Sequence, residues 1–117
     1  MRAFELADLL AAQRSGAKLY HEFLRVPALS MGLYVLPAGG TDPQQPHTED
    51  EVYYIARGRG MILVGEEQRA VTAGSVVYVP AGVEHRFHSV EEELRILVFF
   101  APAEYSQAAG TGSGTEG

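Results

Sequence analysis

The feature that most constrains this chain is a regular alternation of short apolar runs with turns containing glycine or proline, which begins at residue 17. None of these runs is longer than eight residues. We predict strands over residues 18–25, 29–36, 51–56, 61–64, 69–72, 76–79, 85–88 and 94–100. Many short strands at such spacing are typical of an antiparallel sandwich or barrel. The sequence therefore predicts an all-β fold.

The two ends of the chain differ from this pattern. Near the N-terminus, the apolar residues that recur at near-helical spacing are Phe4, Leu6, Leu9 and Leu10. Ser15-Gly16 would end this helix, so we assign residues 1–16 to an N-terminal helix and residues 17–105 to the β-domain. Residues 106–117 have almost nothing apolar to bury, which predicts a disordered tail.

Composition excludes several classes of function. The 117 residues include no cysteine, which removes disulfides, thiolate metal sites and cysteine nucleophiles. The net charge of -6, without a basic stripe, argues against a nucleic-acid partner. No apolar run approaches the roughly 20 residues of a membrane span, and Glu5 and Asp8 interrupt the N-terminal apolar stretch, unlike a signal peptide. We predict a cytoplasmic protein that binds neither nucleic acid nor membrane.

The run over residues 94–100 is apolar on both of its faces. A strand of this kind needs cover on its second face, either from the helix or from another subunit. We favour the second subunit, and the sequence thus predicts a homodimer.

Two stretches, residues 39–58 and 74–89, contain most of the side chains suited to chemistry. Residues two or four apart in an extended segment share a face, which would place Gln45, His47 and Glu51 together. His85 follows a Pro-x-Gly turn at the start of another predicted strand. Two histidines and a carboxylate can form a facial triad that suits ferrous iron and leaves coordination positions open, although zinc, manganese or nickel would also fit.

These stretches resemble the two motifs of the cupin superfamily, and the chain is similar to its small, single-domain bacterial-type members. The first motif, G-x5-H-x-H-x3,4-E-x6-G, is matched by Gly39, His47, Glu51 and Gly58. The second motif, G-x5-P-x-G-x2-H-x3-N, is matched by Gly74, Pro80, Gly82 and His85. The resemblance implies a small cupin β-barrel (a double-stranded β-helix or jelly roll) with one divalent metal ion near one mouth.

The resemblance also implies a ligand set. His47, Glu51 and His85 fall on ligand positions of the motifs, whereas Gln45 replaces a histidine and Ser89 replaces the terminal asparagine. A glutamine carbonyl oxygen can coordinate a metal but is a weaker donor than imidazole. Gln45 is therefore either a fourth ligand or a group that orients water or substrate. Without metal, the same residues would form an internal hydrogen-bond network.

Other polar residues compete for these roles. Glu49 shares the two-residue period and is the alternative carboxylate, but the six-residue gap to Gly58 favours Glu51. We place four further residues outside the site, as outward-facing or unrelated histidines and as turn aspartates: His21, His88, Asp42 and Asp50.

The apolar residues that we expect to line the barrel form a candidate substrate pocket with polar groups at one end. They are Tyr34, Tyr53, Met61, Leu63, Phe87 and Ile96. Of the adjacent Tyr53 and Tyr54, only one can face inward, and Tyr53 shares the parity of Glu51.

The resemblance implies a small metal-dependent enzyme, dioxygenase-like, that acts on an organic small molecule. In such an enzyme Glu51 would double as a catalytic proton acceptor. Two alternatives remain open at this point. One is a non-catalytic module that binds or senses a small molecule, and the other is a metal-independent isomerase that uses His85 and a tyrosine as base and acid.

Overall fold

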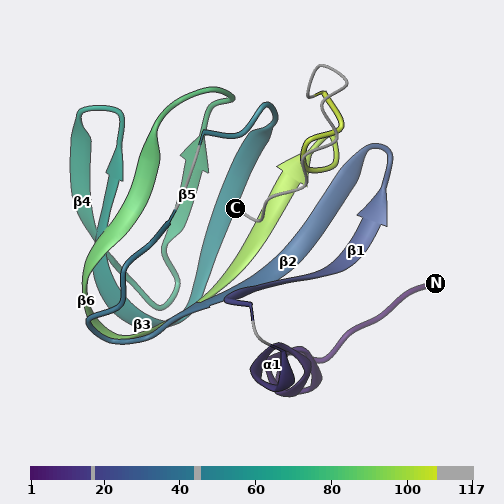
Figure 1. Ribbon diagram of the computed structural model, residues 1–117, viewed down its shortest axis with the longest axis horizontal. Coiled ribbons are helices and arrows are strands. Elements are labelled where there is room, and N and C mark those ends of the chain that lie inside the picture. The colour runs from purple at the N-terminus through teal and green to yellow at the C-terminus, as the bar shows by residue number, and fades with distance from the viewer. Residues whose placement is uncertain (17, 44–45, 108–117) are drawn as a thin grey trace.

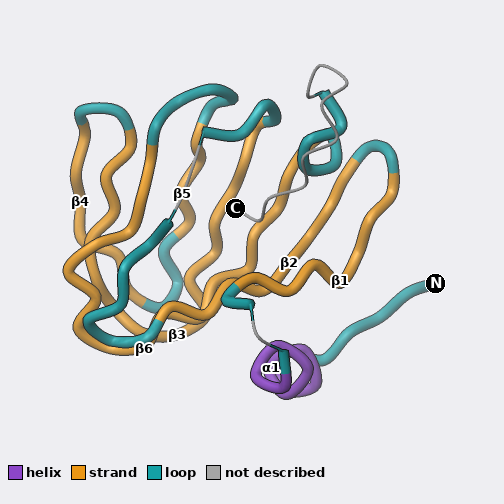
Figure 2. Tube along the Cα trace, viewed as in Figure 1, coloured by secondary structure: helices purple, strands orange, loops and turns teal. Residues whose placement is uncertain are grey.

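The computed structural model describes residues 1–16, 18–43 and 46–107. In these residues the chain forms one helix and six strands (Figure 2): α1 (Leu6–Ser15), β1 (Tyr20–Val26), β2 (Leu29–Leu36), β3 (Asp50–Val64), β4 (Glu67–Thr72), β5 (Val76–Val79) and β6 (His85–Ala101). The predicted helix is present but begins at Leu6. Every predicted strand is found, although β3 and β6 each join two of them.

All strand pairs are antiparallel, in the order β1-β2-β6-β3-β4, and β5 pairs with β3 next to β4. Figure 1 shows a strongly bent sheet with β4 and β5 on one side and β1 and β2 on the other. The long strands β3 and β6 pair with each other along most of their length. The predicted all-β fold class is confirmed.

Residues 57–60, which the sequence predicts to be a turn, are part of the continuous strand β3. The register between β3 and β6 shifts three times between Ile55 and Met61, as it does at β-bulges. Gly58 lies in this stretch with a φ of 94°, and a Cβ atom there would lie 2.0 Å from the carbonyl oxygen of Glu93. Only glycine tolerates this approach, so Gly58 lets the chain pass through the bulges as part of β3. The Arg-Gly repeat therefore continues the strand and does not form a turn.

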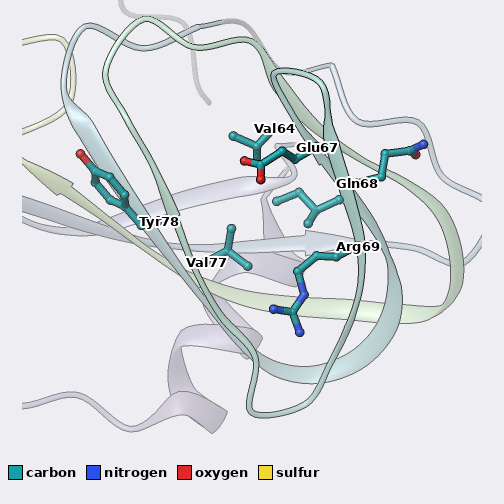
Figure 3. A pocket seen from close by; sticks show the side chains of 7 residues that line it. Val64, Glu67, Gln68, Arg69, Val77 and Tyr78 are labelled. Carbon is teal, nitrogen blue, oxygen red and sulfur yellow. The ribbon is translucent and has the colours of Figure 1, made fainter.

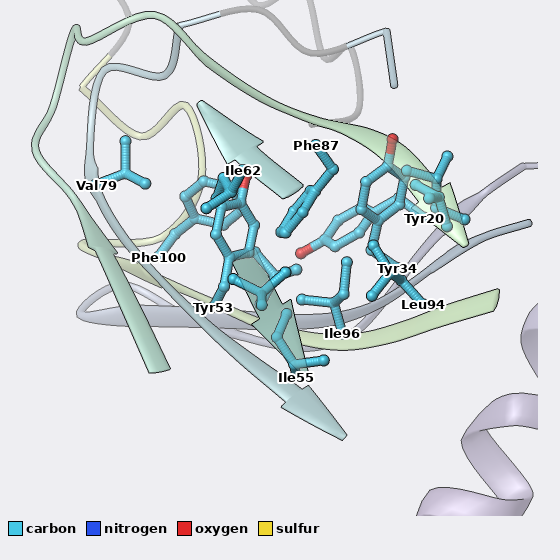
Figure 4. Close-up of a cluster of buried hydrophobic side chains, with 14 residues drawn as sticks. Tyr20, Tyr34, Tyr53, Ile55, Ile62, Val79, Phe87, Leu94, Ile96 and Phe100 are labelled. Carbon is cyan, nitrogen blue, oxygen red and sulfur yellow. The ribbon is translucent and has the colours of Figure 1, made fainter. Parts of the chain in front are cut away.

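The inner face of the sheet carries the main core, which Figure 4 shows as a cluster of aromatic and branched side chains. Four predicted barrel-lining residues belong to it: Tyr34, Tyr53, Phe87 and Ile96. The prediction is wrong for Met61 and Leu63, which are half-buried while their neighbour Ile62 is 1% exposed and belongs to the core. The bulges explain the error, because they change which residues of β3 face inward.

Helix α1 covers part of the outer face of the sheet. Leu9 packs with Leu33 and Val35 of β2 in a second buried cluster, against which Leu97 of β6 also packs. The buried Gln13 side chain donates hydrogen bonds to two carbonyls of the following segment and so fastens the helix to the chain that enters β1. The helix therefore supplies some of the cover predicted for residues 94–100.

After β6 the chain folds back towards the β1–β2 turn. The Ala103 N–H donates to the carbonyl of Pro27, and the Glu104 N–H donates to Ser30 Oγ. Ser106 and Gln107, the first residues of the predicted tail, belong to this turn, while residues 108–117 lie outside the described residues. No helix among the described residues is long and apolar enough to cross a membrane.

Candidate metal centre

Three of the predicted ligands meet at one end of the inner face. His47 lies just before β3, Glu51 is the second residue of β3, and His85 begins β6. The two motif segments are joined directly, because the Gly82 N–H donates to the His47 carbonyl at 2.7 Å. The Ala81 N–H also donates to Asp50 Oδ1 at 2.9 Å, so Asp50 is not the turn residue that the sequence predicts but the first residue of β3, whose carboxylate anchors the turn before His85.

The donor atoms of these residues converge closely. His85 Nε2 lies 3.0 Å from Glu51 Oε1, and His47 Nδ1 lies 3.4 Å from the same oxygen. One ligand atom from each of the three residues lies within 4.8 Å of the others. All three side chains are about 1% exposed, so solvent does little to stabilise them.

The same atoms lack hydrogen-bond partners. His47 Nδ1, both carboxylate oxygens of Glu51 and His85 Nε2 form no aligned hydrogen bond with any described residue. The short contacts to Glu51 Oε1 are thus at ion-pair distance, but they are not aligned as hydrogen bonds. A buried polar group without a partner costs about 1–3 kcal/mol, and more when it is charged. Two imidazoles and a carboxylate with free lone pairs fit a divalent metal ion, which would satisfy all of them at once.

His85 is held in the orientation that a ligand needs. Its Nδ1 lies 2.8 Å from the Val83 carbonyl, and since that oxygen can only accept, Nδ1 carries the proton of the neutral ring. Nε2 is then left with its lone pair towards Glu51. Burial would lower the pKa of His85, but Glu51 and the Val83 carbonyl raise it above its usual value.

His47 contacts a residue that neither motif contains. Its Nε2 lies 3.1 Å from Oε2 of Glu104, which is 6% exposed. The imidazole packs against Phe100 and stacks on Tyr105, with ring centroids 4.6 and 5.2 Å away. Glu104 lies in the turn after β6, and no signal in the sequence places that turn at the site.

Glu51 rather than Glu49 occupies the centre, as the spacing to Gly58 predicts. Glu49 is also 1% exposed, but it accepts hydrogen bonds from the Thr48 hydroxyl and from the N–H groups of Tyr105 and Gln107. Both of its oxygens are thus used to hold the C-terminal turn, so Glu49 is a structural residue.

Asp42 is more than the turn residue that the sequence predicts. It is 7% exposed and accepts hydrogen bonds from the Tyr34 hydroxyl and, at 2.7 Å, from the Phe87 N–H. Burial raises the pKa of Asp42, although these two donors oppose the shift. Asp42 therefore ties the loop before His47 to the inner faces of β2 and β6.

The remaining candidates lie elsewhere. Gln45 is outside the described residues, so its predicted role as fourth ligand stays a prediction. His21 lies on β1, and the Nδ1 atom of His88 contacts the Ser89 hydroxyl at 3.0 Å. Ser89 has a φ of 49°, in the left-handed region that asparagine, the usual residue of this motif position, tolerates well.

The tyrosine pair behaves as the parity argument predicts: Tyr53 is fully buried, whereas Tyr54 is 39% exposed. The Tyr53 hydroxyl has no hydrogen-bond partner among the described residues. Burial and the neighbouring Glu51 carboxylate raise the pKa of Tyr53 well above its usual value, so this phenol keeps its proton.

A groove with a volume of about 180 Å³ opens between β4 and β5 (Figure 3). Its lining combines apolar side chains with polar ones: Ile62, Val64, Val77, Glu67, Gln68, Arg69 and Tyr78. None of the residues predicted for a substrate pocket lines this groove. Val64 is the cross-strand partner of His85, so one wall of the groove adjoins the metal centre.

Comparisons with known proteins agree with this architecture. An uncharacterized protein of Streptomyces coelicolor is 52% identical over 104 residues, which are 89% of this chain and 99% of that protein. The crystal structure of TT1209 from Thermus thermophilus superposes with a TM-score of 0.70 at 26% identity, covering 88% of this chain and 99% of the other. The DMSP lyase DddQ of Ruegeria pomeroyi superposes with a TM-score of 0.61 at 26% identity, covering 65% of this chain and 39% of the lyase.

Residues 32–100 match the family described as Cupin domain. The matched segment contains both motifs and all three converging side chains. Because it also covers more than half of the chain, this protein belongs to the cupin family.

Proposed function

We propose that this cupin is a metal-dependent enzyme that acts on an organic small molecule with dioxygenase-like chemistry. The observation that carries the proposal is the convergence of four buried donor atoms without hydrogen-bond partners among the described residues, on His47, Glu51 and His85. Two histidines and one carboxylate leave several positions of a six-coordinate metal open, as in non-haem iron oxygenases.

These three residues would hold the ion, and other side chains would act on the substrate. When bound, a divalent metal supplies Lewis-acid polarisation of substrate oxygens and a place for dioxygen. Tyr53 keeps its proton, and its hydroxyl lies beside the Glu51 carboxylate, where it can donate a hydrogen bond to a substrate oxygen. Glu51 has a second oxygen beyond the one that both histidines approach, and this oxygen can accept a substrate proton.

The groove between β4 and β5 is our candidate route for the substrate. Its apolar floor includes Val64 and Val77, which pack against the core, and Arg69 lies at its polar edge. A volume of about 180 Å³ suits a compact molecule rather than a polymer. The polar edge would orient an oxygen-bearing group while the apolar floor takes the hydrocarbon part.

The first experiment measures metal content by mass spectrometry on untagged protein purified without chelator. We expect about one equivalent of iron, manganese, nickel or zinc per chain, which the His47→Ala/His85→Ala double variant loses. His21→Ala, which removes a histidine of β1, is the matched control and keeps the metal. Less than about a tenth of an equivalent in wild type, unchanged after adding ferrous iron or zinc, contradicts the proposal.

Activity separates the enzyme from the alternatives. Oxygen uptake by the iron-loaded protein with enol or catechol substrates, abolished in Glu51→Gln, is the expected result. A similar fold in a protein named as a lyase supports an enzyme over a passive binding module. Metal binding without turnover would favour the binding or sensing module, and turnover without metal would favour the isomerase.

We also propose that the protein is a homodimer. The outer face of the sheet beyond α1 exposes Tyr54, Val76 and Tyr78 by 39%, 65% and 57%. Tyr54 and Val76 are cross-strand partners, so these side chains form one apolar patch. Light scattering should give twice the chain mass of 12.7 kDa, and Val76→Glu/Tyr78→Glu should give the monomer. A monomeric wild type contradicts this proposal.

A further inference from the structure

We infer that Glu104, which lies outside both cupin motifs, is a positioning residue of the metal centre: it fixes His47 so that Nδ1, not Nε2, faces the other two ligands. The inference rests on the proposed metal function and adds the residue that selects the ligating atom. Glu104 and His47 are separated by 57 positions in the sequence, so their contact arises from the fold alone.

The geometry divides the two nitrogens of His47 between two carboxylates. Nε2 lies 3.1 Å from Glu104 Oε2, while Nδ1 lies 3.4 Å from Glu51 Oε1. An ionised carboxylate can only accept, so Glu104 selects the ring form with the proton on Nε2. The lone pair is then on Nδ1, the atom that forms no hydrogen bond with any described residue.

Glu104 is itself fixed in place. Its N–H donates to the fully buried Ser30 hydroxyl at 2.8 Å, and its carbonyl accepts from the Arg25 guanidinium at 2.8 Å. Phe100 and Tyr105 restrain the plane of the His47 ring, with Tyr105 stacked at an interplanar angle of 28°. Stacking does not distinguish a ring from its flipped form, whereas the contact with Glu104 does.

The net charge of the metal-loaded site also supports a role for Glu104. Two neutral imidazoles and Glu51 would leave a divalent ion with a net positive charge in a buried site, which is unfavourable. The Glu104 carboxylate would balance that charge from the far side of His47. Carboxylates that accept from the outer nitrogen of a metal-bound histidine typically contribute a factor of about 10–100 to metal affinity.

The test combines zinc affinity with the protonation pattern of His47. Zinc affinity is measured by chelator competition, and nitrogen-15 NMR of the metal-free protein at pH 8 shows which ring nitrogen carries the proton. We expect the Nε2–H form in wild type and, with zinc, a shift change at Nδ1. Glu104→Leu should lose the preference for Nε2–H and bind zinc about 10–100-fold more weakly.

Two further variants act as controls. Glu104→Gln keeps an acceptor oxygen, so it should retain the Nε2–H form and recover most of the zinc affinity. Glu22→Gln removes an exposed negative charge from β1 near Glu104, and should leave both measurements unchanged. Thermal unfolding of each metal-free variant confirms that it is folded, and Glu104→Ala, which also lacks an acceptor oxygen, carries the test if Glu104→Leu does not fold.

The outcomes separate this inference from the proposed function. If wild type binds no zinc or other divalent metal, the proposed function fails, yet the spectrum of the metal-free protein still decides how Glu104 orients His47. An Nδ1–H form in wild type, or a proton position and zinc affinity that do not change in a folded Glu104→Leu, overturns the inference.

Discussion

Buried carboxylates occur in two settings in this structure, and the comparison separates framework from function. Glu49 and Asp42 each accept hydrogen bonds at both carboxylate oxygens. Glu51 is as buried as Glu49, at 1% exposed, yet neither of its oxygens has a hydrogen-bond partner among the described residues. Burial alone therefore does not mark a functional carboxylate. A buried carboxylate with an incomplete set of donors marks a place for a cation.

The two settings depend on each other. Asp42 and Glu49 bracket His47 in the sequence, and each ties its end of the segment to a distant part of the fold. Asp42 binds the Phe87 N–H on β6, and Glu49 binds the backbone of the C-terminal turn that carries Glu104. The hydrogen bonds of Asp42 and Glu49 therefore fix the backbone on both sides of His47. The donor atoms around Glu51 stay close together as a result, without forming aligned hydrogen bonds to one another.

The largest effect should come from metal binding at Glu51. With free zinc at about 1,000 times its dissociation constant, we expect wild type to gain about 4 kcal/mol in the free energy of unfolding. Glu51→Gln should lose nearly all of this gain, because a neutral amide replaces the only charged ligand. Urea unfolding with and without zinc measures the difference.

Glu49→Gln is the matched control, since it makes the same chemical change two residues away. Its amide oxygen can still accept from an N–H group of the C-terminal turn, so it should keep most of the zinc-dependent gain even if the metal-free variant is less stable. A gain of wild-type size in Glu51→Gln would remove the distinction between the two carboxylates.

The next largest effect should follow from removing the Asp42 carboxylate, both of whose oxygens accept hydrogen bonds. Asp42→Ala leaves the Tyr34 hydroxyl and the Phe87 N–H without their acceptor, which should lower the free energy of unfolding by about 3 kcal/mol. Adding Tyr34→Phe removes one of the two stranded donors and should recover about 1 kcal/mol. Urea unfolding of the metal-free proteins tests both, and an Asp42→Ala variant as stable as wild type contradicts the framework role.

Much of this arrangement can be predicted from the sequence because it is encoded locally. The turn residues define the strands, and the motif spacing of His47, Glu51 and His85 is enough to select the three side chains that converge. The choice of Glu51 over Glu49 also follows from spacing, and that of Tyr53 over Tyr54 follows from strand parity.

What the sequence does not reveal depends on contacts between distant segments. Glu104 reaches His47 only because the chain after β6 folds back on the β1–β2 turn. Ile62 replaces its neighbours in the core because bulges near Gly58 shift the parity of β3. Asp42 has the composition of a turn residue, and only the approach of Phe87 turns it into a buried anchor.

A smaller effect, of opposite sign, is expected for Glu51 in the metal-free protein. At pH 8 Glu51→Gln removes a buried charge that receives no hydrogen bond from any described residue, so it should raise the free energy of unfolding by up to about 1 kcal/mol. Urea unfolding in the presence of a chelator measures this change. A loss of stability comparable with that of Asp42→Ala would mean that Glu51 already has adequate partners without metal.

The smallest effect concerns a carboxylate near the surface. Partial burial would raise the pKa of Glu93, but Arg95 and Arg14, at 2.9 and 2.6 Å, hold it below its usual value. Its contribution is therefore present above the unfolded-state pKa of about 4.3 and is lost as the pH falls through the lower folded-state value. Since its side chain is 31% exposed, Glu93→Gln should cost about 0.5 kcal/mol at pH 7 and nothing at acidic pH.

Asp42 should show the reverse pH dependence, because burial raises its pKa in the folded state. The folded protein then holds the Asp42 proton more tightly than the unfolded chain. Its contribution to stability falls as the pH rises from the unfolded-state value of about 3.9 through the folded-state value. Urea unfolding from pH 3.5 to 7 should therefore give difference curves of opposite slope for Glu93→Gln and Asp42→Asn. Parallel curves would mean that the hydrogen bonds from Tyr34 and Phe87 outweigh the burial of Asp42, so that its pKa, like that of Glu93, is lowered in the folded protein.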